Sequence, residues 1–157
     1  MLAATVRDMD EKKYLEKLRQ KLFRQDNFRQ VTMTREWAKE IPSKAGVYVF
    51  KDNEKIVYDG ETGNLRGRMK DLLDSRHHTI RRTIGVKFYS TIDGFVKATT
   101  KFKFPEHIEI LVNGHICEKL LLAYVEVSLG RKELEEMIES NIDKEVRLNK
   151  RGKRKHS

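Results

Sequence analysis

The spacing of apolar residues changes several times along the chain, and each change marks an expected secondary-structure element. Residues 10–25 place apolar side chains at helical spacing among Lys and Arg, which predicts an amphipathic helix. A short second helix is expected to begin after Thr34, a good N-cap residue, and to carry Trp37 into the core. Residues 46–50 and 55–59 are rich in β-branched and aromatic residues and flank a polar turn, so they predict a β-hairpin.

The chain returns to helical spacing directly after this hairpin. Residues 62–64 offer capping side chains, and the apolar positions from Leu65 predict a helix that extends to about Asp74. Residues 86–104 alternate often enough to predict two or three strands, in which lysines interleave with phenylalanines. This stretch fits either a strand with a basic face or a half-buried strand with a solvated lysine edge. Residues 107–127 contain two apolar runs around Asn-Gly, which predicts a second hairpin, although the second run also permits some helix.

Residues 131–142 complete the pattern with one more amphipathic helix. Its apolar stripe consists of Leu134, Met137, Ile138 and Ile142. A β-rich centre flanked by helices predicts an α+β fold with a small central antiparallel or mixed sheet. The length of 157 residues suits one domain with one core.

Charge and composition narrow the class of protein. Lys and Arg number 33 against 24 acidic residues, and the formal net charge of +9 favours a polyanionic partner over a merely basic soluble protein. Cys117 is the only cysteine, so an intrachain disulfide is excluded and a reducing compartment is plausible. The chain shows neither an apolar run long enough to span a membrane nor the apolar core of a signal peptide. We therefore expect a cytoplasmic protein with no membrane partner.

The expected hairpin and the helix after it carry a recognisable motif. The first strand contains Gly-Val-Tyr at residues 46–48, and the second contains Tyr-Asp-Gly at residues 58–60. Asn-Leu-Arg-Gly-Arg follows at residues 64–68. Both halves at this spacing, with the N-L-x-x-R continuation, resemble the signature of the GIY-YIG nuclease superfamily over about residues 44–149. The chain thus resembles a small stand-alone member with a GIY-YIG-like core.

The resemblance implies a divalent-metal-dependent DNA endonuclease that hydrolyses phosphodiester bonds, either restriction-like or repair-like. The catalytic residues that it implies are Tyr48, Tyr58, Arg68, Glu135 and Asn149. Glu135 is expected to bind the metal, with Glu139 one helical turn away as the alternative. The expected ion is Mg²⁺, for which Mn²⁺ can substitute.

The same resemblance assigns a role to each type of side chain. Arg68 is expected to pair with a phosphate oxygen whose charge grows in the transition state. Tyr48 or Tyr58 is expected to orient or deprotonate the attacking water. Because an unperturbed phenol has a pKa of about 10, Arg68 or the metal is expected to lower it.

Two positions depart from the family pattern. Asp59 stands where an apolar residue is usual, and we expect its side chain to point away from Tyr58 as a tolerated substitution rather than a catalytic group. Leu72 stands where many members have a His or Tyr one turn after the Arg. His77 or His78 fills that vacancy only if the chain folds back towards the site. As neighbours in sequence, these two histidines suit a shared metal poorly.

Basic and polar residues around the motif predict where DNA is contacted. These residues are Lys44, Asn64, Arg66, His78, Arg81 and Arg82. The cluster at residues 75–82 fits phosphate contacts, with helix-capping or surface roles as the alternative. Double-stranded DNA is the expected partner, and a double-strand cut would need a homodimer or two successive nicks.

The resemblance also implies a division of the chain. Residues 1–43 are expected to form a helical extension packed on a nuclease domain of residues 44–149, followed by a basic tail of residues 150–157. The alternative function is a catalytically silent GIY-YIG-like module that binds nucleic acid or protein, with Asp59 as a sign of lost activity.

Overall fold

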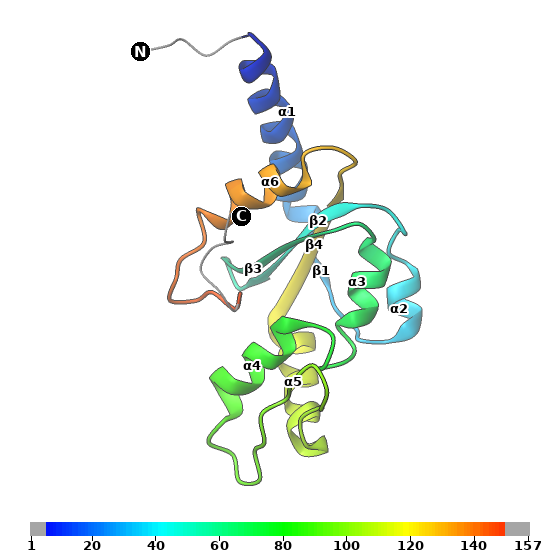
Figure 1. Ribbon diagram of the computed structural model, residues 1–157, viewed down its shortest axis with the longest axis vertical. Helices are drawn as coiled ribbons and strands as arrows, with labels where there is room; N and C mark the ends of the chain where they lie inside the picture. Colours follow the sequence, from blue (N-terminus) through cyan, green and yellow to red (C-terminus); the bar gives the residue numbers. More distant parts are fainter. Residues whose placement is uncertain (1–5, 150–157) are drawn as a thin grey trace.

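A computed structural model of the chain describes residues 6–149, and it has the α+β architecture that the sequence predicts. A four-stranded antiparallel sheet, in the order β1-β4-β2-β3, forms the centre, and helices cover both of its faces (Figure 1). Along the chain the elements are α1 (Val6–Leu22), the 3-10 turn η1 (Gln25–Asn27), β1 (Arg29–Gln30), α2 (Arg35–Lys39), β2 (Gly46–Asp52), β3 (Lys55–Thr62), α3 (Leu65–Asp71), α4 (Thr79–Tyr89), α5 (Glu106–Lys119), β4 (Leu120–Glu126) and α6 (Arg131–Glu139).

The predicted central hairpin is confirmed as the β2–β3 pair. Asp52 pairs with Lys55, so the turn is two residues tight, and Asn53 takes the left-handed conformation (φ 54°) that asparagine tolerates well. Val49 lies opposite Asp59, and Tyr48 lies opposite Gly60. Because β3 is an edge strand, one side of its backbone is open to segments from outside the sheet.

Side chains alternate across the sheet and separate two apolar layers. Tyr48, Phe50 and Tyr58 share one buried cluster with residues from α2, α3, α4 and α5. Val47 and Val49 share the other cluster with residues from α1 and α6. In Figure 1, α1 and α6 accordingly lie on one side of the sheet, and the remaining helices lie on the other.

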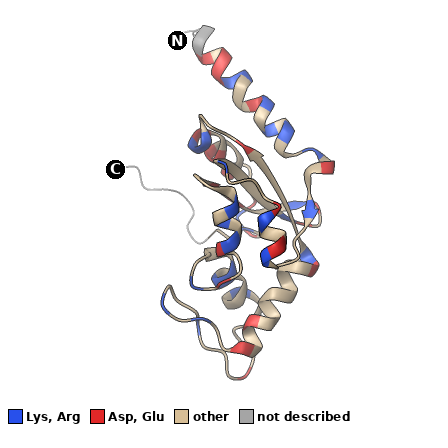
Figure 2. Ribbon diagram, turned by 90° about the vertical axis from the view of Figure 1, so that its right-hand side faces the viewer, with Lys and Arg blue, Asp and Glu red and all other residues tan. Residues whose placement is uncertain are grey.

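The segments before the hairpin add one strand to the sheet and two helices that pack on it. α1 is mostly polar and buries Leu22 at its C-terminal end, with Leu15 and Leu18 partly buried beside it. Acidic and basic residues alternate along its exposed length (Figure 2). Thr34 caps α2 by accepting a hydrogen bond from the Trp37 N–H, as predicted. β1 pairs with β4, so residues 29–30 belong to the sheet. The division of the chain at residue 43 stays a prediction, and the basic tail from residue 150 lies outside the described residues.

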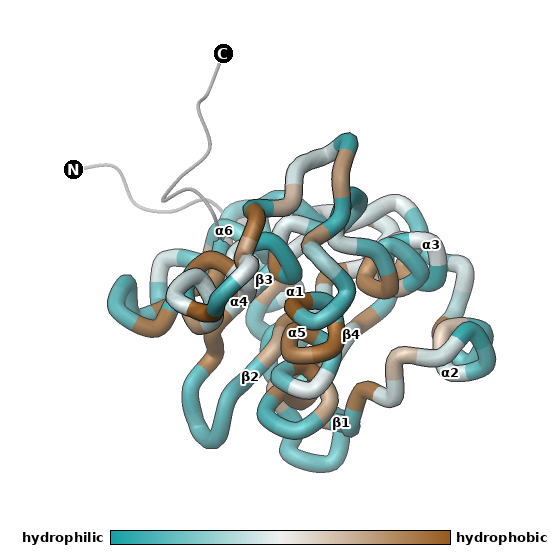
Figure 3. The backbone as a smooth tube through the Cα atoms, turned by 90° about the horizontal axis from the view of Figure 1, so that it is seen from below, coloured by the Kyte–Doolittle hydropathy of each residue, from teal (hydrophilic) through white to brown (hydrophobic). Residues whose placement is uncertain are grey.

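The strands predicted at residues 86–104 are wrong. Of the hairpin predicted at residues 107–127, only the second strand is confirmed, as β4. Residues 86–89 end α4, an irregular segment follows, and α5 passes through the Asn-Gly pair before β4 begins. Ile108, Val112 and Ile116 recur every four residues and are fully buried, which is the helical period that the hairpin interpretation missed. Figure 3 shows hydrophobic stretches along α5. No helix of the described part has the length and apolarity needed to cross a membrane.

A buried ion pair joins α4 to α5. Arg81 is 1 % exposed, and its guanidinium lies 2.5 Å from the Glu109 carboxylate. Arg81 also donates hydrogen bonds to Ser75 Oγ at 2.9 Å and to Asn113 Oδ1 at 2.6 Å. The sequence analysis placed Arg81 on a DNA-contacting surface, whereas the structure places it in the interior, where it connects the segment before α4 to α5.

We expect Arg81→Met to lower the free energy of unfolding by about 3–5 kcal/mol, because it leaves the Glu109 carboxylate buried without its cation. Urea denaturation at neutral pH measures this loss. Lys87→Met, on the exposed side of the same helix, is the control and should change stability by less than about 0.5 kcal/mol. Equal stability losses in the two variants would show that the ion pair does not support the α4–α5 contact.

Candidate active site

Two tyrosines, an arginine and a histidine meet on the α3–α5 side of the sheet. The rings of Tyr48 and Tyr58 stack with centroids 6.1 Å apart. Arg68 Nε donates a hydrogen bond to the Tyr48 hydroxyl at 3.3 Å, and His78 Nε2 lies 3.2 Å from the same oxygen. A Cβ at Gly60 would lie 2.5 Å from the Tyr48 hydroxyl, so the glycine after Tyr58 and Asp59 leaves the space that this ring occupies. The structure thus brings together Tyr48, Tyr58 and Arg68, as the sequence predicts.

Arg68 is positioned by the start of α3. Asn64 caps this helix by accepting a hydrogen bond from the Gly67 N–H at 3.1 Å, and Arg68 lies one turn after the cap. The guanidinium also donates to the His77 carbonyl at 3.0 Å and to Asp71 at 3.3 Å. These bonds hold the Arg68 head beside Tyr48 while its side chain stays 26 % exposed.

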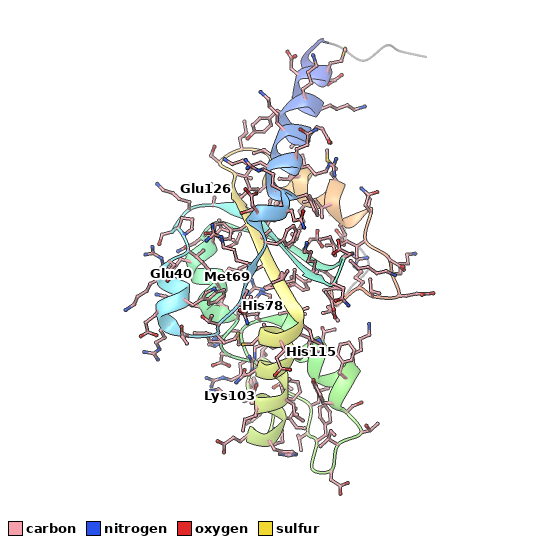
Figure 4. All side chains as sticks on the ribbon, turned by 180° about the vertical axis from the view of Figure 1, so that it is seen from behind. Glu40, Met69, His78, Lys103, His115 and Glu126 are labelled. Carbon is pink, nitrogen blue, oxygen red and sulfur yellow. The ribbon has the colours of Figure 1, made fainter. Side chains whose placement is uncertain are left out.

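His78 lies beside the Tyr48 hydroxyl, at 3.2 Å from Nε2 to the oxygen. The chain folds back after α3, and His78 becomes the N-cap of α4, buried in the middle of the molecule (Figure 4). Its Nδ1 accepts a hydrogen bond from the Ile80 N–H at 3.2 Å. Burial, followed by the nearby Arg68 charge, lowers the pKa of His78 well below 6.5, so the ring is neutral at pH 7. With Nδ1 accepting, the proton of the neutral ring sits on Nε2 and points at the Tyr48 oxygen.

Burial also decides the protonation of the two phenols. It raises the pKa of Tyr48 well above 10.0 and raises the pKa of Tyr58 as well. The Arg68 charge opposes both shifts but is outweighed, so Arg68 alone does not produce the lowered phenol pKa that the sequence analysis expects. Burial lowers the pKa of Arg68, yet Tyr48 and its other neighbours raise it by more, and the guanidinium stays charged.

A group of three carboxylates lies on the other face of the same edge strand. One oxygen from each of Asp59, Glu135 and Glu139 lies within 4.8 Å of the other two. Asp59 and Glu135 are buried, and Glu139 forms an ion pair with Arg147. Both candidate glutamates of α6 therefore face the same point. Asp59 does point away from Tyr58, as expected, but the structure places its side chain against α6 and in this group, a role that the sequence analysis did not assign.

Asn149 lies at the edge of β3, between the cluster around Tyr48 and the three carboxylates. Its side chain accepts a hydrogen bond from the Asp59 N–H at 3.2 Å and donates one to the Asp59 carbonyl at 2.9 Å. Asn149 therefore holds the backbone from which Tyr58 and Asp59 project to opposite faces. The predicted catalytic residues are thus divided, with Tyr48, Tyr58 and Arg68 on one face, Glu135 on the other, and Asn149 at the edge between them.

Of the residues predicted to contact DNA, His78 and Arg81 are buried, and the other four lie partly or fully exposed at several places in the fold. Lys44 and Asn64 are exposed, and Arg66 donates a hydrogen bond to the Ile41 carbonyl at 2.7 Å. Arg82 donates to the carbonyls of residues 75 and 76 and also lines a pocket of about 520 Å³. This pocket is formed by α4, residues 97–100 and Asn149. The sequence analysis missed it because it assigned residues 97–100 to a strand.

A family model and a solved structure resemble this chain. The model of a family described as the GIY-YIG catalytic domain matches residues 28–155. No curated protein matches the chain. The chain is similar, at 16 % identity and a TM-score of 0.38, to a crystal structure of the GIY-YIG N-terminal endonuclease domain of UvrC from Thermotoga maritima, a point mutant bound to its catalytic divalent cation. The similarity covers 74 % of this chain and 94 % of that domain.

The buried neutral His78 makes stability depend on pH in a defined direction. As the pH falls below about 6.5, the unfolded chain takes up a proton at this histidine and the native state does not, so the free energy of unfolding falls. The slope from this one group is at most about 1.4 kcal/mol per pH unit. Urea denaturation between pH 7.5 and 5 of the wild type and His78→Gln measures it, and the variant should show the smaller pH dependence. An unchanged dependence would contradict the neutral, buried assignment.

Proposed function

This chain belongs to the GIY-YIG family, and from that premise we propose that it is a DNA endonuclease that hydrolyses phosphodiester bonds with the help of a divalent metal ion. The proposal rests on two clusters of side chains that lie on opposite faces of β3. A charged arginine beside two phenols lies on one face, and three carboxylates lie on the other. The formal net charge of +9 fits a polyanionic substrate, for which we propose double-stranded DNA.

The cluster of three carboxylates fits the metal ion that this function requires. Asp59, Glu135 and Glu139 offer hard oxygen ligands, which Mg²⁺ and Mn²⁺ prefer. Three carboxylates this close repel one another, and a bound cation would relieve that repulsion. When bound, the ion supplies Lewis-acid stabilisation of the charge that develops on phosphate oxygens during the reaction.

The residues on the other face would bind and orient the substrate. The partly exposed Arg68 guanidinium is the group best placed to pair with a phosphate oxygen, in a charge-assisted hydrogen bond that strengthens as negative charge develops. The Tyr48 oxygen already receives the Arg68 Nε–H and faces the His78 Nε2–H. The Tyr48 proton is therefore directed away from both of these donors. The Tyr58 hydroxyl is left to donate to the substrate or to orient the attacking water.

A catalytically silent module that binds nucleic acid or protein is the alternative function. The observation in its favour is the depth of the phenols, because Tyr48 and Tyr58 are only 1 % and 6 % exposed. Catalysis would require the edge of β3 to open when the substrate binds, whereas simple binding would not. A restriction-like role, with double-strand cuts made by a homodimer or by two nicks, is the finer proposal within the enzyme class, and the cytoplasm is the location that we propose for it.

Arg68→Ala should abolish nicking of supercoiled plasmid in Mg²⁺, because it removes the charge that stabilises the transition state. The wild type should nick the plasmid in Mg²⁺ or Mn²⁺ and should stop when EDTA is added. Lys70→Ala, an exposed cation on the same helix, is the matched control and should nick at the wild-type rate. Plasmid left intact by the wild type in both metals would support the silent module instead.

Metal binding by the three carboxylates can be tested without measuring catalysis. Mn²⁺ should raise the melting temperature of the wild type, because a ligand that binds only the native state stabilises it. Asp59→Asn and Glu135→Gln should each lose most of that rise, since each removes one charged ligand. Glu136→Gln, an exposed carboxylate on α6, is the control and should keep it. A full Mn²⁺ shift in Asp59→Asn would return Asp59 to the role of a tolerated substitution.

A further inference from the structure

The irregular segment between α4 and α5 is anchored to the core on both sides of its tip. Ala98 and Phe104 are 1 % and 4 % exposed. The Phe104 ring packs against Phe95 and directly over Gly85 of α4, where a Cβ would lie 2.2 Å from the ring. The tip at residues 99–103 is therefore held in a defined place on the molecule.

The tip presents one aromatic ring to solvent. Phe102 is 70 % exposed, although a phenylalanine gains free energy when its ring is buried. The Thr99 hydroxyl accepts hydrogen bonds from the N–H groups of Lys101 and Phe102, at 3.1 and 3.0 Å. The Thr99 N–H donates to the Phe102 carbonyl at 2.8 Å. These three bonds close a tight turn, so the backbone holds the ring in its exposed position.

The surroundings of this ring are basic. Residues 97–104 contain three lysines and no acidic residue, and Phe102 lies between Lys101 and Lys103 in the sequence. Lys103 Nζ lies 3.9 Å from the Asp74 carboxylate, so Lys97 and Lys101 are the lysines on which the proposal depends. Lys97 lines the pocket that also contains Arg82, Lys87 and Asn149. A strip of cations therefore leads from the tip towards the edge of β3, and Figure 2 shows basic positions along this loop.

We propose that the loop of residues 97–103 grips the DNA duplex next to the cut, with Lys97 and Lys101 on phosphates and the Phe102 ring inserted as a wedge against a base that it partly unstacks. An exposed aromatic side chain among cations is complementary to a nucleic acid, because bases offer flat faces and the backbone offers anions. Lysine is depleted in the cores of protein–protein interfaces, so the same surroundings disfavour a protein partner. The proposal rests on the proposed function in one respect, namely that DNA is the substrate.

The experiment is a binding titration that does not depend on cleavage. A short fluorescein-labelled DNA duplex is titrated with the full-length protein in EDTA, and fluorescence anisotropy gives the dissociation constant. Phe102→Ala should raise that constant about fivefold or more, the effect of losing one base-stacking contact. Phe102→Trp should retain the affinity. Leu129→Ala, which removes an exposed apolar side chain from the loop before α6, is the control and should bind like the wild type.

Salt dependence separates the ring from its lysines. Lys101→Ala should lower the slope of log affinity against log salt by about one, because one phosphate contact is lost. Phe102→Ala should leave that slope unchanged while the affinity falls. Thermal melts of Phe102→Ala should match the wild type, since the ring is exposed and supports no packing.

The outcomes distinguish this inference from the proposed function. Wild-type affinity in Phe102→Ala, in a protein that cuts plasmid, overturns the role of the loop and leaves the nuclease proposal standing. DNA binding that depends on Phe102, in a protein that never cuts, supports the loop and contradicts the nuclease.

Discussion

The register of the β2–β3 pair decides where each candidate functional side chain lies. Tyr48 faces Gly60 across the pair, and Val49 faces Asp59, so Tyr58 and Asp59 project to opposite faces of one edge strand. A slip of one residue would exchange their faces, because side chains alternate with a period of two. The tight turn at Asn53 and the contact between the Tyr48 ring and Gly60 both hold this register.

The register alone does not complete the site, because three further segments converge on the hairpin. The Arg81–Glu109 ion pair holds the segment that precedes α4, and His78 at the end of that segment reaches the Tyr48 hydroxyl. The segment after α6 returns along β3 and bonds its edge through Asn149. The arrangement therefore depends on polar groups that are buried and hydrogen-bonded, which are costly to leave unpaired.

Some of this organisation could be predicted, and the failures have a physical cause. The hairpin and the caps at Thr34 and Asn64 depend on neighbouring residues, and they were correctly predicted. The region of residues 86–127 was assigned mainly to strands because short apolar runs satisfy both periods. In that region, packing of α5 against α4 and the sheet selects the helix over the hairpin that Asn-Gly favours in isolation.

The sequence by itself determined the chemistry of the chain: its basic charge, the hairpin with a tyrosine on each strand, and the arginine on the next helix. Only the tertiary structure decided which of these groups meet. It placed His78 beside Tyr48, buried Arg81 against Glu109, and set Asp59 against two glutamates that follow more than 70 residues later. The physical reason is that spacing along a chain fixes contacts only within a helix or a hairpin. Contacts between distant segments depend on how all the apolar faces pack at once.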